Sequence, residues 1–264
     1  MRYKNILKKT ALLFSVTILA LFSVYPQGSM SKSRKHFFKC GDKSNPCAIK
    51  NKKALEKFRD KVNNGKSFKD WHFVQTKDID LQNAEWTPIG ISGSDKYFEG
   101  TYDGNGHVIK NLNVSSAHAG FFGVLSGTVK NLGIESGTIA GDYAGSIAGR
   151  SGGENAALIN CYNKAAVTGK FRAGGIADDF GKGTIINCAN EGTVTAPVTG
   201  EIVSYNAADI IAAHSESSGL PNTFDGNYTE FNSAEKKITD KLNDGLFHLI
   251  SQKVIDRSAV KKWR

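Results

Sequence analysis

The chain has 264 residues, of which 40% are hydrophobic, with 28 Gly, 5 Pro and 4 Cys. This composition excludes a disordered chain, a collagen-like fibre and a small scaffold built on disulfides, and it suits one large domain or two small ones. The 34 basic and 25 acidic residues give a net charge of +9, which by itself would suggest a nucleic-acid partner.

The N-terminus is predicted to be an export signal over residues 1–28. Arg2, Lys4 and two further lysines precede an apolar run, Ala11 to Tyr25, which stops before a proline. This run has the length of a signal-peptide core and is shorter than the roughly 20 residues that cross a bilayer as a helix. Since no small-x-small pair marks a cleavage site, an uncleaved anchor stays open. We therefore expect a secreted or cell-surface protein.

A basic linker is predicted over residues 29–46. Its charge comes from four residues interspersed with serines: Lys32, Arg34, Lys35 and Lys39. We expect a solvated tether that can also contact an anionic cell envelope. Residues 108–232 carry 7 basic and 11 acidic side chains, so the basic excess lies at the two ends of the chain. This distribution and the export signal argue against a nucleic-acid partner.

The four cysteines form two pairs by position. Cys40 and Cys47 lie close in sequence, and in an exported protein they predict a local disulfide that joins the linker to the domain. Cys161 and Cys188 stand at equivalent repeat positions, and we expect stacked, buried thiols. Neither pair has the C-x-x-C spacing of a zinc site, and the six histidines show no metal-ligand spacing, so no metal is expected.

An N-terminal α/β cap is predicted over residues 47–107. Leu55, Phe58 and Val62 recur at helical spacing, and Asn64-Gly65 ends the helix. Alternating strand patterns follow. An amphipathic helix here would cover the first open coil of a repeat structure.

Residues 108–214 repeat themselves with a period in the twenties. Four segments carry Asn followed by Leu or Cys, and a second element with the pattern Ala-Gly-x-x-(Ala)-Gly recurs between them. The repeated asparagines are Asn111, Asn131, Asn160 and Asn187; the second element begins at Ala119, Ala144 and Ala173. Short strands between glycine turns cannot bury an apolar side alone, but stacked copies can.

This pattern predicts an all-β chain that forms a parallel β-helix, or β-solenoid. One repeat is one coil, and like residues lie over like residues about 4.8 Å apart. The four asparagines are then expected to form a structural ladder at one turn, where their amides bond to one another and to the bent backbone. We expect the solenoid to be a monomer.

The repeats resemble the GLUG motif of bacterial secreted and surface proteins. The resemblance rests on Gly120-Phe-Phe-Gly123, Gly145-Ser-Ile-Ala-Gly149, Gly174-Gly-Ile-Ala177 and the lead-in Phe98 to Leu112, and it extends over roughly residues 47–232. The same motif occurs upstream of the catalytic domain in IgA-specific zinc metallopeptidases. The resemblance implies a right-handed parallel β-helix with an adhesive or spacer role. The pattern departs at Asp178, where glycine or a small residue is expected.

A C-terminal helical cap is predicted over residues 215–264. Ser233 is a candidate N-cap, and Leu242, Leu246 and Leu249 continue an apolar stripe that Gly245 interrupts. The helix is expected to cover the last coil. Trp263 is expected to dock locally.

Catalytic chemistry has weak support in this sequence. It holds no H-E-x-x-H, no G-x-S-x-G and no phosphate loop, and no cofactor is expected. His107 is expected to make a structural hydrogen bond. The alternative rests on Asp178 and Asp179, because paired carboxylates serve polysaccharide lyases and glycoside hydrolases, with Asp142, Arg172 or Lys182 on neighbouring coils. Adjacent strand residues point to opposite faces, however, so the two share a site only within a turn.

The favoured interpretation is a non-enzymatic, adhesin-like protein that binds an extracellular glycan or protein. Candidate contact residues are aromatic: Tyr97, Phe98, Tyr162, Phe171, Tyr205 and Tyr228. A degradative enzyme on the same scaffold is the alternative.

Overall fold

The computed structural model describes residues 40–200, 203–215, 237–251 and 256–263. The chain divides into two compact units, residues 1–40 and 41–264, and of the first only Cys40 is described. The predicted signal peptide and most of the predicted linker therefore lie outside the described residues. All of the described strands and helices belong to the second unit.

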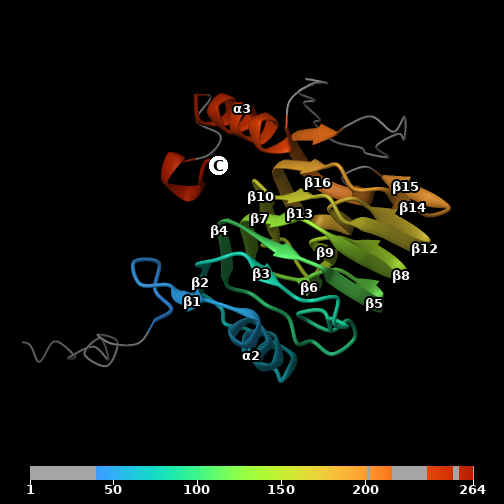
Figure 1. Cartoon of the computed structure of the whole chain (residues 1–264), viewed down its shortest axis with the longest axis horizontal. Coiled ribbons are helices and arrows are strands. Elements are labelled where there is room, and N and C mark those ends of the chain that lie inside the picture. The colour runs from blue at the N-terminus through green and yellow to red at the C-terminus, as the bar shows by residue number, and fades with distance from the viewer. Residues whose placement is uncertain (1–39, 201–202, 216–236, 252–255, 264) are drawn as a thin grey trace, which may run out of the picture. The chain divides into compact units, whose positions relative to one another are not determined.

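Among the described residues, the second unit is built almost entirely from short parallel strands, with two helices and one 3₁₀ turn (Figure 1). The strands are β1 (Cys47–Ile49), β2 (His72–Gln75), β3 (Ile79–Asp80), β4 (Thr101–Lys110), β5 (Leu112–Ala119), β6 (Phe122–Leu125), β7 (Thr128–Ile134), β8 (Gly137–Gly145), β9 (Ala148–Ser151), β10 (Ala157–Ile159), β11 (Tyr162–Asn163), β12 (Ala166–Gly174), β13 (Ala177–Asn190), β14 (Val194–Thr195), β15 (Val198–Gly200) and β16 (Val203–Ser215). The helical elements are α2 (Lys52–Asn63), α3 (Ile238–Ser251) and η2 (Arg257–Ala259).

The strands stack into a β-solenoid of about six turns. Its first side is the column β1, β2, β4, β7, β10, β13 and β16, in which each strand pairs in parallel with the next. Residues one coil apart face each other directly in the order Phe73, Tyr102, Val129, Leu158, Ile185 and Ile210. Because β1, β2 and the start of β4 already belong to this column, the predicted cap boundary at residue 108 cuts through β4.

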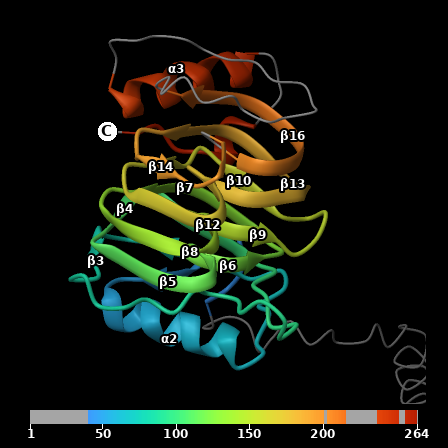
Figure 2. The same ribbon diagram turned by 90° about the vertical axis from the view of Figure 1, so that its right-hand side faces the viewer.

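Three further sides complete each coil (Figure 2). The ends of β4, β7 and β13, with β3 and β11, form the second side. β5, β8 and β12 form the third side as a separate sheet, to which β14 and β15 pair. β6, β9 and the start of β13 form the fourth. The predicted all-β parallel solenoid is thereby confirmed.

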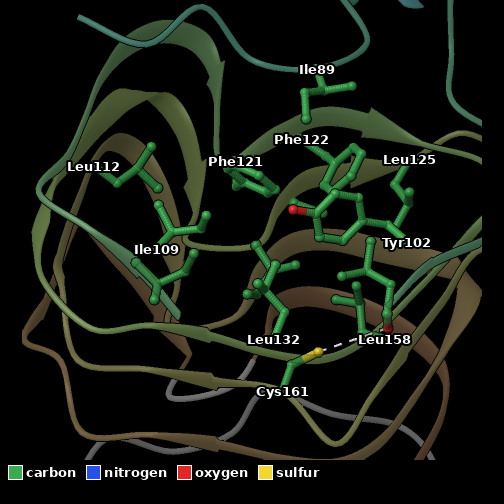
Figure 3. Packing of buried hydrophobic residues seen from close by; sticks show 14 of the residues in the cluster. Ile89, Tyr102, Ile109, Leu112, Phe121, Phe122, Leu125, Leu132, Leu158 and Cys161 are labelled. Carbon is green, nitrogen blue, oxygen red and sulfur yellow. Dashed lines mark hydrogen bonds between the residues drawn. The ribbon is translucent and has the colours of Figure 1, made fainter. Parts of the chain in front are cut away.

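The interior is a continuous apolar core, in which the rings of Tyr102, Phe121 and Phe122 lie among aliphatic side chains (Figure 3). Most of its aromatic residues belong to the N-terminal coils. Helix α2 closes onto the aromatic end with its buried face. The ring of Phe58 lies 4.6 Å from that of Phe73 and 5.1 Å from that of Phe98. At its N-terminus the side chain of Asn51 accepts a hydrogen bond from Ala54 N at 3.0 Å, which satisfies one free helix donor. Burying Phe58 contributes about 2 kcal/mol.

An amide ladder runs along the corner between the first and second sides. Asn187 Nδ2 donates to Asn160 Oδ1 at 3.0 Å, and Asn160 Nδ2 donates to Asn131 Oδ1 at 2.8 Å. Asn131 Nδ2 continues to Asp103 Oδ1 at 2.9 Å. The three asparagines have φ between 50° and 55°, a left-handed conformation that asparagine tolerates better than other side chains. Each of these asparagines therefore both bends the backbone and bonds to a neighbouring coil.

Asn111 is not part of this ladder, contrary to the prediction. It lies at the next corner, between the second and third sides, where its Nδ2 donates to Asp80 Oδ1 at 2.8 Å and its Oδ1 accepts from Ser136 Oγ at 3.2 Å. The ladder position in its coil belongs to Asp103, followed by a turn in which Asn105 takes the left-handed conformation. The same kind of residue, a left-handed asparagine, thus occurs at two different corners.

The C-terminal residues lie along the outer edge of the amide ladder and across the second side. Lys261 N donates to Asn131 Oδ1 and Lys261 O accepts from Asn160 Nδ2, each at 2.9 Å. Trp263 is buried against Tyr162, with ring centroids 4.8 Å apart. Helix α3 precedes this segment, and its Leu242 O accepts from Asn187 Nδ2 at 2.9 Å. Trp263 docks as expected, but it contacts the flank of several coils.

The cysteines differ in state. Cys40 and Cys47 are disulfide-bonded, whereas Cys161 and Cys188 are free and fully buried. Burial raises the pKa of the Cys161 thiol well above its ordinary value, so the thiol is protonated and unreactive.

Candidate functional site

The two carboxylates of the enzymatic alternative have separate structural partners. The Asp178 side chain is fully buried and receives two hydrogen bonds from Arg172, from Nε at 3.2 Å and from Nη2 at 3.0 Å. Asp179 Oδ1 accepts from Gly181 N at 3.2 Å. Both residues belong to β13, where neighbours alternate between faces. The two carboxylates of the alternative thus contact different groups, Arg172 and the Gly181 backbone.

Close to Asp178, three rings from successive coils stack on the third side. The ring centroids of His118 in β5 and Tyr143 in β8 are 5.1 Å apart with an interplanar angle of 16°, and those of Tyr143 and Phe171 in β12 are 5.6 Å apart at 38°. We call His118, Tyr143 and Phe171 the aromatic column. Phe171 is 47% exposed, so the column ends in an open apolar ring.

Cations flank the column. The guanidinium carbon of Arg172 lies 4.8 Å from the Tyr143 ring centroid, and the Lys170 ammonium lies 5.0 Å from that of Phe171. The two hydrogen bonds to Asp178 hold the Arg172 guanidinium over the ring of Tyr143. Val198, in register with Arg172 and 43% exposed, extends the apolar surface. The result is a fixed surface of exposed apolar groups and cations.

Local sequence explains why the column lies at this corner. A Cβ added at Gly149, where the chain enters the fourth side, would lie 3.1 Å from His118 Cβ. Glycine there lets the third and fourth sides approach closely. Asp178 occupies the corresponding position one coil later, and its carboxylate is accommodated by bonding to Arg172. The departure from the repeat pattern at Asp178 is therefore what anchors the cation.

The electrostatics of the column follow from burial and this ion pair. Burial lowers the pKa of His118, and the nearby charge of Arg150 lowers it further, so the imidazole is neutral at pH 7. Although burial disfavours the charged guanidinium, the hydrogen bonds and charge of Asp178 raise the pKa of Arg172 overall. The His118 Nδ1 atom is buried without a hydrogen-bond partner in the part of the chain that the structure describes.

The aromatic residues predicted to contact a ligand lie in different environments. Phe98 is core, and Tyr162 is buried beneath Trp263. Tyr97 is partly buried and donates to Asp95 Oδ1. Phe171 is exposed within the aromatic column, and the side chains of Tyr205 and Tyr228 lie outside the described residues.

His118 and Tyr143 were not predicted as site residues from the sequence, and Arg172 was a candidate only for the enzymatic alternative, although a signal was present. Each directly precedes an Ala-Gly pair of the recurring second element, at Ala119, Ala144 and Ala173. Alignment on those pairs puts the three side chains in one column, as the strand register does. His107 makes the expected structural contact, with Nδ1 3.2 Å from Asp78 Oδ1.

Residues 40–200, 203–215, 237–251 and 256–263 show neither a metal cluster nor a membrane-spanning helix. No three His, Cys, Asp or Glu side chains gather there as a metal site would require. No helix in those ranges has the length and apolarity to cross a membrane.

Comparison with known proteins gives two similarities, and no protein-family model matches the sequence. A solved structure of a candidate immunoglobulin A1 protease from Bacteroides ovatus superposes with a TM-score of 0.50 at 26% identity, over 68% of each chain. Halomucin from Haloquadratum walsbyi is 35% identical over 94 residues, which are 33% of this chain and 1% of halomucin. The chain thus spans only a very small part of that relative. The structural similarity agrees with the predicted resemblance to repeats found in IgA-specific peptidases.

Proposed function

We propose that this chain is an exported, surface-exposed or secreted β-solenoid of the GLUG type, which binds an extracellular ligand without turning it over. In this proposal the solenoid is right-handed and monomeric, α2 and the C-terminal residues act as its caps, and the N-terminal residues direct export. The internal repeats and the similarity to the Bacteroides ovatus protein support it.

The aromatic column is the observation that carries the binding role. Aromatic side chains and arginine are enriched where proteins bind partners, because they bury large areas at small entropic cost. Here Tyr143 is fixed between two rings and under Arg172, so it is preorganised, while Phe171 is open to a partner. Glycans and proteins both use such surfaces.

The test is retention of the purified protein on a panel of host and bacterial glycans and surface proteins, with release of new sugar ends or peptides measured in parallel. The matched variants are Phe171→Ala on the column and Ile91→Ala, an exposed apolar residue that is not part of the column. We expect Phe171→Ala to weaken retention about tenfold or more and Ile91→Ala to leave it unchanged. Equal retention by both variants would contradict a binding role for the column.

The enzymatic alternative has no comparable support. Its carboxylates, Asp178 and Asp179, are bound to Arg172 and to the Gly181 backbone, and their roles there are structural. Turnover on the panel that is abolished by Asp179→Asn in a stably folded variant would restore it.

A further inference from the structure

A hollow of about 420 Å³ lies at a different corner of the coils from the aromatic column, where the fourth side returns to the first. Its lining comes from segments one coil apart, and we call it the corner groove. The residues that matter for its chemistry are Lys69, Asp70, His72, Glu99, Thr101 and Thr128. This volume is within the range of ordinary ligand sites. None of these residues belongs to the aromatic column.

The rim of the corner groove is formed by a strained segment. Phe68 and Asp70 have φ of 54° and 62°, and a left-handed conformation is a genuine outlier for a bulky residue such as Phe68. The Phe68 ring is held in the core, 4.9 Å from that of Phe73. This conformation leaves Lys69 and Asp70 exposed at the rim. Backbone strain that the surrounding packing maintains is typical of functional sites.

A polar column runs through the groove parallel to the solenoid axis. His72, Thr101 and Thr128 stand in direct register on β2, β4 and β7. They are about 4.8 Å apart from coil to coil, as paired strands are. Burial lowers the pKa of His72, and the charges of Lys130 and Lys43 lower it further, so its ring is neutral at pH 7. An imidazole and two hydroxyls, each able to donate and to accept, thus repeat at a fixed step.

The floor of the groove is backbone. A Cβ at Gly127 would lie 2.1 Å from Gly100 O, so no side chain fits there. At the opposite margin a Cβ at Gly153 would meet nothing within 4 Å and its φ is unstrained, so that margin is open. The groove therefore persists because glycine, and not a larger residue, lines it.

We propose that the corner groove binds an extended chain of neutral sugars that lies parallel to the solenoid axis, with successive sugars over successive coils. The length of one sugar unit in an extended β-linked glycan is comparable to the spacing between coils. Each sugar ring can therefore contact one polar side chain of the column His72, Thr101 and Thr128. The charged residues that line the groove are two acids, Asp70 and Glu99, and one base, Lys69. The resulting net charge of −1 disfavours acidic sugars and phosphates. The groove-lining residues named above offer no apolar pocket for a peptide side chain. This inference does not depend on the aromatic column.

The test is calorimetric titration of the purified protein with hexasaccharides of β-1,4-linked glucose, β-1,4-linked mannose and α-1,4-linked glucose, and with an oligogalacturonate. Gly153→Trp fills the groove from its open margin, Thr128→Val removes one hydroxyl at constant shape, and Phe171→Ala alters only the aromatic column. We expect one neutral β-linked hexasaccharide to bind. Thr128→Val should weaken it about tenfold, the value of one hydrogen bond, and Gly153→Trp should abolish binding.

Four outcomes would overturn the proposal: no neutral hexasaccharide binds, the oligogalacturonate alone binds, Gly153→Trp binds as the unaltered protein does, or Phe171→Ala and not Gly153→Trp abolishes binding. The last result would assign the glycan to the aromatic column and leave the proposed function intact. Equal unfolding midpoints of the three variants confirm that each is folded.

Discussion

Asn160 and Asn131 are 29 residues apart in sequence, yet the Nδ2 of Asn160 donates to the Oδ1 of Asn131 at 2.8 Å. The bond joins two successive coils at a corner where neither side chain is exposed to water. Both amides also bond to Lys261 of the C-terminal segment. One buried side chain thus connects the coil before it, the coil after it and the end of the chain.

We expect Asn160→Ala to lower the free energy of unfolding by about 3 kcal/mol. The substitution removes one of two hydrogen bonds at Asn187 Nδ2 and at Asn131 Oδ1, and it deprives the buried Trp263 Nε1 of its acceptor. An unsatisfied buried polar group costs about 1–3 kcal/mol. The substitution also places alanine in a left-handed conformation. Urea unfolding measures the change, and exposed Asn64→Ala is the control. Equal midpoints for the two variants would show that the ladder does not stabilise the solenoid.

The ladder also shows how far sequence reasoning reaches. The recurrence of asparagine and glycine predicted the solenoid, because stacking makes each coil need the same residue at the same corner. It did not distinguish corners: Lys110-Asn111-Leu112 and Lys130-Asn131-Leu132 are identical tripeptides at different corners. Both asparagines take the left-handed conformation and bond through their amides to another coil. Only the strand register, which depends on the insertion between Asp103 and His107, separates them.

Trp263 should stabilise the whole solenoid although it is the penultimate residue. Its side chain is 5% exposed, packs against Tyr162 and donates from Nε1 to Asn160 Oδ1 at 3.3 Å. Trp263→Ala is expected to cost about 3 kcal/mol, in the range of large-to-small core substitutions. Urea unfolding and hydrogen exchange of the second side measure it. Exposed Lys262→Ala should change little, and a Trp263→Ala protein as stable as that control would contradict the docking.

The two adjacent carboxylates should differ in their effect on stability. Asp178→Ala removes a fully buried carboxylate that accepts two hydrogen bonds from the partly buried Arg172, and breaking such a pair costs about 3 kcal/mol or more. Asp179→Ala removes a single bond to Gly181 N, worth about 1 kcal/mol. Thermal or urea unfolding of the two variants decides this. A reversed order, or equal small effects with loss of an activity, would favour the enzymatic interpretation instead.

The aromatic column marks the limit of prediction from single residues. Phe171 was a candidate because of its type, but Tyr143 and His118 became part of a site only through contacts between coils. An irregularity in β12 between Gly169 and Arg172 shifts the register, and that shift places Phe171 over Tyr143 while Arg172 faces it. No residue type in the sequence reports that irregularity. Residues such as Phe98 and Tyr162 resemble binding aromatics equally well and are buried.

Stability is expected to fall as the pH drops below about 7, because two histidines are held neutral. Burial, with Arg150, lowers the pKa of His118 below its ordinary 6.5, and burial, with Lys130 and Lys43, lowers that of His72. The unfolded chain, with ordinary pKa values, binds more protons between 6.5 and the lowered values. The stabilising contribution of both residues is therefore complete above pH 6.5 and is lost as the pH falls toward the folded-state pKa.

His118→Phe keeps the stacking on Tyr143 and removes the titration, so it should flatten the dependence of the urea midpoint between about pH 7.5 and 5.5. His72→Gln should flatten it further. A slope unchanged in the double variant would show that other groups cause the acid sensitivity.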